Sequence, residues 1–163
     1  MTKIVTYLEM TARDQLRPAA PVSGLALELL DAGDPLVISL QVEIGAPFGW
    51  GSATRTPEQW AERRGRNPDR QHWAVTFEGA PAGMVAYQPQ PGDEVEIETF
   101  GLTPAFTGRR LGGYALTLGL EKAWTLLPVV KRVWLHTSTQ DHPNALPNYR
   151  ARGLTPYRTE TSD

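Results

Sequence analysis

Residues 100–113 combine glycine, arginine and proline in a pattern suited to binding a phosphate group. They read Phe-Gly-Leu-Thr-Pro-Ala-Phe-Thr-Gly-Arg-Arg-Leu-Gly-Gly, so an expected strand stops at Pro104 and a helix begins near Leu111. Glycine lets the backbone approach an oxyanion, and the free amides and dipole of a first helical turn favour negative charge. Glycine and arginine also occur in ordinary strand-to-helix turns, so this turn alone favours an anion site only modestly.

The elements that must hold this turn are predicted from hydrophobic spacing. Alternation predicts a strand over residues 94–102, and apolar residues at helical spacing predict a helix over 111–127 that Pro128 ends. A strand over 130–137, a short helix over 145–152 closed by Gly153, and a last strand over 155–159 follow. The turn therefore lies between a strand and the longest predicted helix.

The first half of the chain supplies strands and two shorter helices. A strand is expected over residues 4–8, whereas 25–30 suits either a strand or a helix. One helix is expected from Pro35 to about Gly45, and a capping pattern at residues 56–59 predicts another that ends near Gly65. A hairpin (72–78 with 82–87) and a connection (88–93) come next. This order indicates an α/β protein whose mixed sheet carries helices on both faces.

Composition narrows the class of protein. The 163 residues, 40% hydrophobic and 21% charged, suit a single domain over 1–163. A net charge of −2 without a basic run argues against a nucleic-acid partner. No apolar run reaches membrane-spanning length and the N-terminus lacks a signal-peptide pattern, so we expect a cytoplasmic protein without a membrane partner. The absence of cysteine excludes disulfides, thiolate metal ligands and a cysteine nucleophile.

The turn resembles a motif of the GNAT superfamily of N-acetyltransferases. That motif has the form Gln/Arg-x-x-Gly-x-Gly/Ala and aligns here with Thr107-Gly108-Arg109-Arg110-Leu111-Gly112. Thr107 replaces the first Gln/Arg, and Arg110 replaces a nearly standard glycine. The guanidinium groups of Arg109 and Arg110 are expected to compensate by pairing with phosphate.

A second resemblance to the same superfamily lies in the last predicted helix. Its pattern Asn-x-x-Ala-x-x-x-Tyr-x-x-x-Gly-Phe is matched by Ala145, Tyr149 and Gly153, with His142 at the asparagine position. Asn144 is expected to cap this helix, which places Pro147 in the first turn, where no amide bond is lost. Together the two matches cover the chain from about residue 73 to residue 157.

The resemblance implies a GNAT-type fold with a mixed, mostly antiparallel central sheet and a splayed parallel strand pair. Acetyl-CoA would lie between the separating strands 94–102 and 130–137 as a co-substrate, with no metal involved. The implied cofactor-binding residues are Leu102, Thr103, Thr107, Gly108, Arg109, Arg110, Leu111, Gly112, Gly113 and Asn144. The amine would attack the thioester directly, so no covalent enzyme intermediate is expected.

Two proton transfers accompany such an attack. Tyr149 is the expected acid, because a phenol can protonate a leaving thiolate without ionising beforehand. Glu96 and Glu98 are alternative bases that strand alternation places on the same face as Phe100, and water is a further alternative. Each of these residues also has an ordinary structural interpretation, as a core aromatic or a solvated carboxylate.

The acceptor side is less specified. Trp50, which lies between two glycines, and Tyr87 are the expected acceptor-binding residues, although aromatic residues are more often part of a core. His136, Asp141 and His142 are too few to predict a metal site.

The protein is expected to acetylate a small-molecule amine. The alternatives are that it is a non-catalytic acyl-CoA-binding module or an enzyme that acetylates protein N-termini or lysines. Homodimerisation is an expectation from the superfamily alone.

Overall fold

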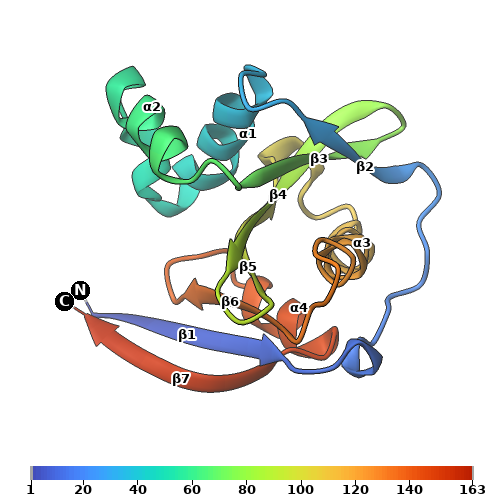
Figure 1. Ribbon diagram of the computed structural model, residues 1–163. Helices are drawn as coiled ribbons and strands as arrows, with labels where there is room; N and C mark the ends of the chain where they lie inside the picture. Colours follow the sequence, from blue (N-terminus) through green and yellow to red (C-terminus); the bar gives the residue numbers. More distant parts are fainter. Residues whose placement is uncertain (1, 163) are drawn as a thin grey trace.

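The computed structural model describes residues 2–162, which form one seven-stranded sheet with helices around it (Figure 1). The order of the strands in the sheet is β2-β3-β4-β5-β6-β1-β7. The strands are β1 (Lys3–Met10), β2 (Leu25–Leu30), β3 (Gln71–Phe77), β4 (Ala80–Gln90), β5 (Glu94–Leu102), β6 (Arg132–Ser138) and β7 (Thr155–Ser162). The α-helices are α1 (Leu36–Gly45), α2 (Pro57–Arg66), α3 (Gly112–Ala123) and α4 (Ala145–Ala151).

The sheet is antiparallel except for the β5–β6 pair. These two parallel strands are in register only at Glu94 with Arg132, Val95 with Val133 and Glu96 with Trp134. Beyond Glu96 they separate, although β5 continues to Leu102 and β6 to Ser138. The predicted mixed sheet with a splayed parallel pair is therefore confirmed.

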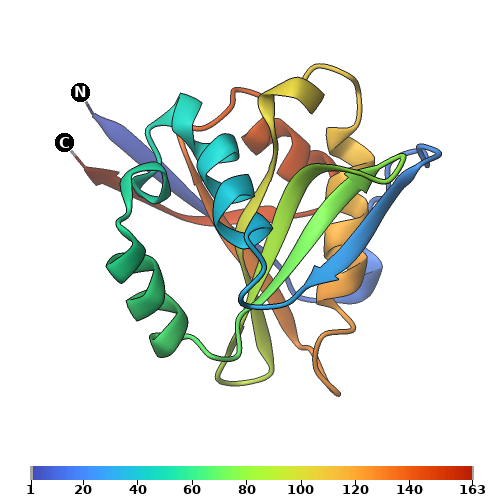
Figure 2. The ribbon, with the colours of Figure 1, turned by 90° about the horizontal axis from the view of Figure 1, so that it is seen from above.

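Helices cover both faces of the sheet, as the sequence predicts (Figure 2). On one face, α3 packs Leu116, Leu120 and Ala123 into the main core, with Val85 and Tyr87 of β4. On the other face, α1 packs Val37, Leu40 and Ile44 against Ala74 of β3 and Met84 of β4. Because neighbouring strand residues point to opposite faces, β4 contributes to both layers of the core.

Most local predictions are confirmed, although several elements differ in length: β1 and β7, for example, are each three residues longer than predicted. Thr56 and Gln59 form the expected capping box at the start of α2, and the ambiguous segment 25–30 is a strand. The connection expected over 88–93 is shorter, because β4 continues through Pro89 to Gln90. Helix α3 ends at Ala123 rather than at residue 127, and Trp124, its C-cap, still packs in the core.

The N-terminal strand β1 lies inside the sheet, between β6 and β7. It pairs antiparallel with both neighbours, over Val5–Met10 against β6 and over Lys3–Glu9 against β7. The first and last strands of the chain are thereby joined, and the two termini lie next to each other (Figure 1). Among residues 2–162, no helix combines the length and apolarity that crossing a membrane would need.

Candidate active site at the strand split

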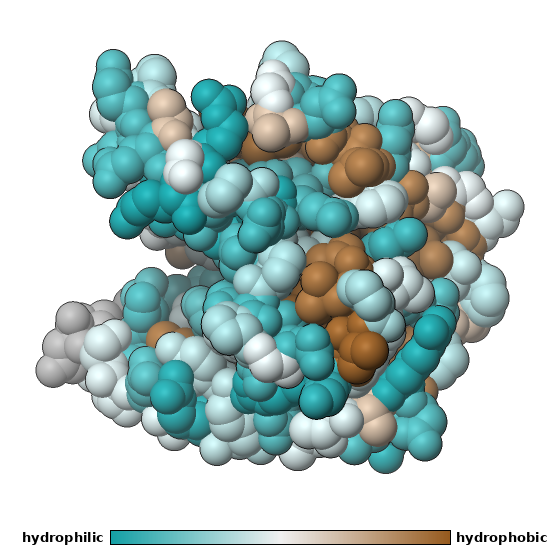
Figure 3. Space-filling view, viewed as in Figure 1, coloured by the Kyte–Doolittle hydropathy of each residue, from teal (hydrophilic) through white to brown (hydrophobic). Residues whose placement is uncertain are grey.

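The separation of β5 from β6 opens two adjoining cavities. The larger, about 580 Å³, is bounded by the end of β5, the start of α3, and α4; the smaller, about 280 Å³, lies between residues 48–55 and strands β1, β5 and β6. Five residues line both cavities: Phe48, Trp50, Phe100, Asp141 and Tyr149. The space-filling view shows a notch between the surface over α2 and the surface over β1 and β7, on the side of the smaller cavity (Figure 3).

The predicted turn before α3 presents unpaired amides to the larger cavity. Gly108 and Arg110 both have left-handed backbone conformations, with φ of 73° and 61°, and the α-helix begins at Gly112. Among residues 2–162, the amides of residues 108–113 have no hydrogen-bond acceptor. Successive amides in alternating left- and right-handed conformations form a concave anion site, and a helix N-terminus adds to it.

Arg110 therefore adopts the backbone conformation that glycine would adopt at this position. For a residue with a side chain, the left-handed region costs roughly 1–2 kcal/mol. The side chain of Arg110 lines the larger cavity, so the same residue that carries this conformational cost also brings a positive charge to the anion site. Backbone strain of this kind is concentrated at functional sites.

The structure brings together eight of the ten predicted cofactor-binding residues. Those that line the larger cavity are Leu102, Thr107, Gly108, Arg110, Leu111, Gly112, Gly113 and Asn144. Asn144 occupies the N-cap position of α4, as expected, but its side chain makes no capping hydrogen bond. The amide of Thr107 is bonded to the carbonyl of Thr103, so the free donors begin at Gly108.

The side chains of two predicted cofactor-binding residues do not line the larger cavity. Thr103 is 4% exposed, and its amide and hydroxyl both donate to the carbonyl of Ala82, which fixes the end of β5 against β4. The guanidinium of Arg109 lies over the rings of Phe77 and Phe106, at 5.3 and 5.1 Å. The side chain of Arg109 thus stacks on two rings and does not line the larger cavity, and its pairing with phosphate stays a prediction.

Helix α4 contributes two further residues that the sequence interpretation missed. Asn148 Nδ2 donates to the carbonyl of Gly112 at 3.1 Å and so joins α4 to the start of α3. Arg152 lines the larger cavity, and its buried Nε has no hydrogen-bond partner among the described residues. A Cβ on Gly113 would lie 2.6 Å from Arg152 Nη1, so a larger residue there would displace the guanidinium from its present position. Both residues lie close to Tyr149 in the helix motif, and this position could have identified them from the sequence.

Tyr149 lies where the two cavities meet. It is 6% exposed, and its ring makes an edge contact with Phe100 at a centroid distance of 6.2 Å. Among residues 2–162 its hydroxyl has no hydrogen-bond partner, so it is available to a ligand. Burial, and secondarily the negative charge of Asp141, raises the pKa of Tyr149, which keeps the phenol protonated at neutral pH.

Asp141 is the second residue of this junction, and the sequence interpretation considered it only as a metal ligand. Its carboxylate accepts hydrogen bonds from Trp50 Nε1 at 2.9 Å, Thr137 Oγ1 at 2.7 Å and the amide of Ser138 at 3.0 Å. Asp141 thereby fixes the indole of Trp50, a predicted acceptor-binding residue, against both cavities. Its position just after β6, at the strand split, was the signal that could have identified it.

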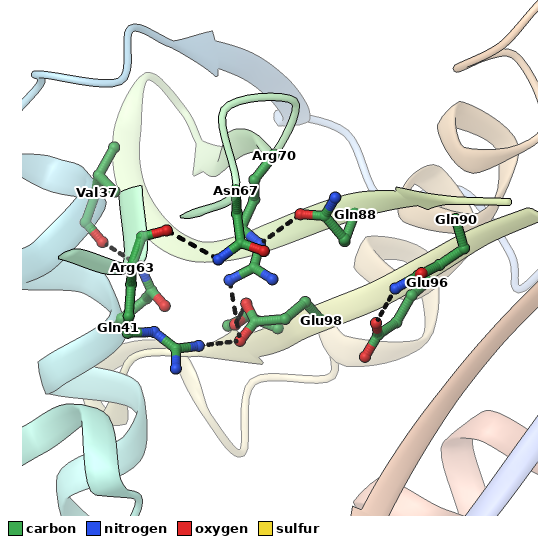
Figure 4. Close-up of polar contacts among 10 residues, drawn as sticks. Val37, Gln41, Arg63, Asn67, Arg70, Gln88, Gln90, Glu96 and Glu98 are labelled. Carbon is green, nitrogen blue, oxygen red and sulfur yellow. Dashed lines mark hydrogen bonds and ion pairs between the residues drawn. The ribbon is translucent and has the colours of Figure 1, made fainter. Parts of the chain in front are cut away.

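The two candidate bases occupy different surroundings (Figure 4). Glu98 lines the smaller cavity, but Oε1 pairs with Arg63 and Arg70, at 3.4 and 3.7 Å, and Oε2 accepts from Thr99 at 2.7 Å. Glu96 lies at the last paired position before the split and accepts a hydrogen bond from Gln90 at 2.9 Å. Burial raises the pKa of Glu96, although the hydrogen bond from Gln90 opposes this shift.

A β-bulge corrects the predicted direction of these side chains. Ala86 is paired with Thr99 and Tyr87 with Ile97, so Glu98 is an extra residue in β5. The bulge reverses the alternation: Phe100 packs on Tyr149, on the side of α4, whereas Glu98 faces Arg63 of α2. The glutamates and Phe100 therefore do not share a face.

Tyr87 is not part of the candidate site. It is fully buried in the main core, and its hydroxyl donates to the carbonyl of Gly119 in α3. The expectation that it binds the acceptor is wrong, because β4 directs it towards α3, away from both cavities. Across residues 2–162, no group of three or more His, Asp or Glu side chains is arranged to hold a metal ion.

Comparison with known proteins identifies the family. The model of the acetyltransferase (GNAT) family matches residues 38–154, which span both motifs, the strand split and most of both cavities. No curated protein sequence matches the chain significantly.

Solved structures show the same fold at low sequence identity. A GCN5-related N-acetyltransferase from Sphaerobacter thermophilus superposes with a TM-score of 0.67 at 16% identity, over 97% of this chain and 50% of the other. One from Kribbella flavida gives 0.64 at 15% identity, over 97% and 56% of the two chains. A tandem GNAT protein from the clavulanic acid biosynthesis pathway gives 0.60 at 21% identity, over 99% and 53%. This chain thus spans about half the length of these relatives, and it belongs to the GNAT family of acetyltransferases.

Proposed function

We propose that the protein transfers an acetyl group from acetyl-CoA to the primary amine of a small-molecule acceptor. One observation carries this proposal: a cavity lined by a turn with free amides meets a second, smaller cavity at Tyr149, whose hydroxyl has no partner among residues 2–162. The first cavity suits the coenzyme, the second suits the acceptor, and the proton donor lies where the two substrates would meet.

The residues of the larger cavity fit acetyl-CoA. Its volume, about 580 Å³, lies within the usual range of small-molecule sites. The free amides of residues 108–113, with the guanidinium groups of Arg110 and Arg152, would hold the diphosphate. The end of β5, at Gly101 and Leu102, would lie along the pantetheine arm. Bound there, the coenzyme supplies an activated acyl group.

The chain's own residues then move two protons. The amine nitrogen forms a bond to the acyl carbon while the carbon–sulfur bond breaks, and Tyr149 donates its phenolic proton to the departing sulfur. Glu96 accepts the proton that the nitrogen loses, through a water molecule, because it lies outside the lining of the acceptor cavity. We assign this role to Glu96 because its raised pKa makes it the stronger proton acceptor, whereas both oxygens of Glu98 already accept from protein donors.

Glu96→Gln is expected to lower kcat/KM at neutral pH by about 100-fold and to remove the acidic limb of its pH profile. In the wild type, kcat/KM should fall as the pH drops through the pKa of Glu96, which burial places above its ordinary value. A raised folded-state pKa also means that ionisation of Glu96 opposes folding. The stability of Glu96→Gln relative to the wild type should therefore increase as the pH rises from the ordinary pKa of a glutamate through the raised folded-state pKa of Glu96.

The matched control for this variant is Glu98→Gln. It should lower the melting temperature, because Arg63 and Arg70 lose their carboxylate partner, yet leave the acidic limb in place. The pH profiles of kcat/KM, measured by thiol release at saturating acetyl-CoA, show which of the two glutamates is the base. Loss of the acidic limb in Glu98→Gln alone would assign the base to Glu98, and an unchanged limb in both variants would assign it to water.

The overall proposal is tested by titration calorimetry with acetyl-CoA and CoA, followed by a thiol-release assay with a panel of amines. We expect binding of both coenzyme forms and amine-dependent release of thiol. Binding without release on any small amine or peptide would indicate a non-catalytic acyl-CoA-binding module. Release only with peptide amines would indicate a protein acetyltransferase. Absence of coenzyme binding would contradict the assignment of the larger cavity.

A further inference from the structure

The smaller cavity carries cationic side chains that lack an anionic partner. Arg55 and Lys3 both line it, and neither forms an ion pair within residues 2–162. The guanidinium of Arg55 lies over the ring of Trp60, 4.7 Å from its centroid, which fixes its position without neutralising it. A half-buried arginine with no carboxylate partner leaves its strongest hydrogen-bonding capacity unused.

The two carboxylates of the same cavity are already satisfied by the protein. Glu98 is bonded to Arg63, Arg70 and Thr99, as Figure 4 shows for the two arginines. Asp141 accepts from Trp50, Thr137 and Ser138. The positive charge around Glu98 therefore exceeds its single negative charge before Arg55 is counted.

The pKa of Arg55 is lowered in this surplus of positive charge. Burial lowers the pKa of Arg55, and the positive charge of Arg63 lowers it further, whereas the charge of Glu98 only partly opposes both effects. A second cation placed in this cavity would add to the repulsion, and an anion would relieve it. Polyamines and other polycationic amines are therefore poorly suited to this site.

An unused hydroxyl lies in the same wall. Ser52 lines the smaller cavity and is 5% exposed, and its Oγ has no hydrogen-bond partner in the described part of the chain. Leaving a buried hydroxyl without a partner costs about 1–3 kcal/mol. A hydroxyl can donate to an oxyanion, and Ser52 lies in the same cavity wall as Arg55, three residues before it in the chain.

We propose that the acceptor amine carries an anionic group, a carboxylate or a phosphate monoester, which Arg55 and Lys3 bind in the smaller cavity. The inference rests on the proposed acetyl transfer, and it narrows the acceptor to amino-acid-like or phosphorylated amines. The anionic group lies against Arg55 while the amine is directed towards Tyr149, which lines the same cavity.

Matched amine pairs test the proposal in the wild-type protein. L-amino acids are compared with their amides, and O-phosphoethanolamine with ethanolamine, by thiol release at saturating acetyl-CoA. A higher kcat/KM for the anionic member, by at least 10-fold in one pair, is the expected result, and the pair that shows it distinguishes carboxylate from phosphate. Equal or better turnover of the neutral amines would overturn this inference while leaving acetyl transfer intact. No thiol release with any amine would instead contradict the proposed function.

Variants of Arg55 provide a second test of the proposed anionic acceptor. Arg55→Gln should raise KM for the anionic acceptor by about 10- to 100-fold, the effect of losing a charge-assisted pair, and leave KM for acetyl-CoA unchanged. Arg55→Lys should recover part of the loss, because it keeps the charge but not the bidentate geometry. Arg64→Gln, on the exposed surface of α2, is the matched control and should have no effect. An unchanged KM in Arg55→Gln would overturn the proposal, and Lys3→Gln gives the same test if that variant does not fold.

Discussion

Tyr149→Phe should lower kcat by about 100- to 1,000-fold and leave the Kd for acetyl-CoA unchanged. The substitution removes only the hydroxyl, so the ring keeps its edge contact with Phe100. Because this hydroxyl has no partner among residues 2–162, its loss breaks no hydrogen bond and should not lower the melting temperature. Single-turnover thiol release, calorimetry with acetyl-CoA and a thermal melt measure the three quantities.

Tyr87→Phe is the matched control for this prediction. It also removes a buried phenolic hydroxyl, but one that bonds to the carbonyl of Gly119 and lies outside both cavities. We expect it to lower the free energy of unfolding by about 1–3 kcal/mol, because that carbonyl loses its donor, and to leave kcat unchanged. Equal turnover in wild type and Tyr149→Phe would remove Tyr149 from the mechanism.

Gly112→Val should weaken acetyl-CoA binding by about 30- to 1,000-fold, the equivalent of two charge-assisted hydrogen bonds or about 2–4 kcal/mol. Gly112 is the first residue of α3 and lines the cavity where the free amides lie. A Cβ there would meet only Asn148 Nδ2, at 3.7 Å, an ordinary contact, so the fold should accept the substitution. The branched side chain would occupy space that the diphosphate needs.

Gly65→Val is the control that shows whether a glycine-to-valine substitution elsewhere in the protein also weakens acetyl-CoA binding. Gly65 is an exposed glycine of α2 with open space around its Cβ position, so the variant should bind acetyl-CoA as the wild type does. Calorimetry on both variants, with circular dichroism to confirm folding, completes the comparison. Native affinity in a folded Gly112→Val protein would show that the alignment of the turn with the family motif is in the wrong register.

The candidate site was only partly predictable, and the reason differs between its residues. Gly108, Arg110 and Gly112 lie in one continuous segment, so the sequence could predict that they line the same site. Asp141 meets Trp50 across 91 residues of chain, and no local pattern connects them. Arg109 and Arg110 are neighbours of the same type, yet one stacks on two rings and the other lines the cavity.

By itself, the sequence determined the elements whose signals are local. The capping box at Thr56, the turn before α3 and the end of α4 at Gly153, with φ of 105°, depend on residues within a few positions of one another. These signals are local because nearby side chains determine the backbone conformation of their own segment.

Only the tertiary structure decided how distant segments pair. It placed β1 between β6 and β7, inserted the bulge at Glu98 and directed Tyr87 into the core. Each outcome depends on which strand edge or helix face packs against the segment concerned. Such pairing is stabilised by burial and hydrogen bonds between segments far apart in the chain. The two cavities arise in the same way, since they exist only where β5 and β6 stop pairing.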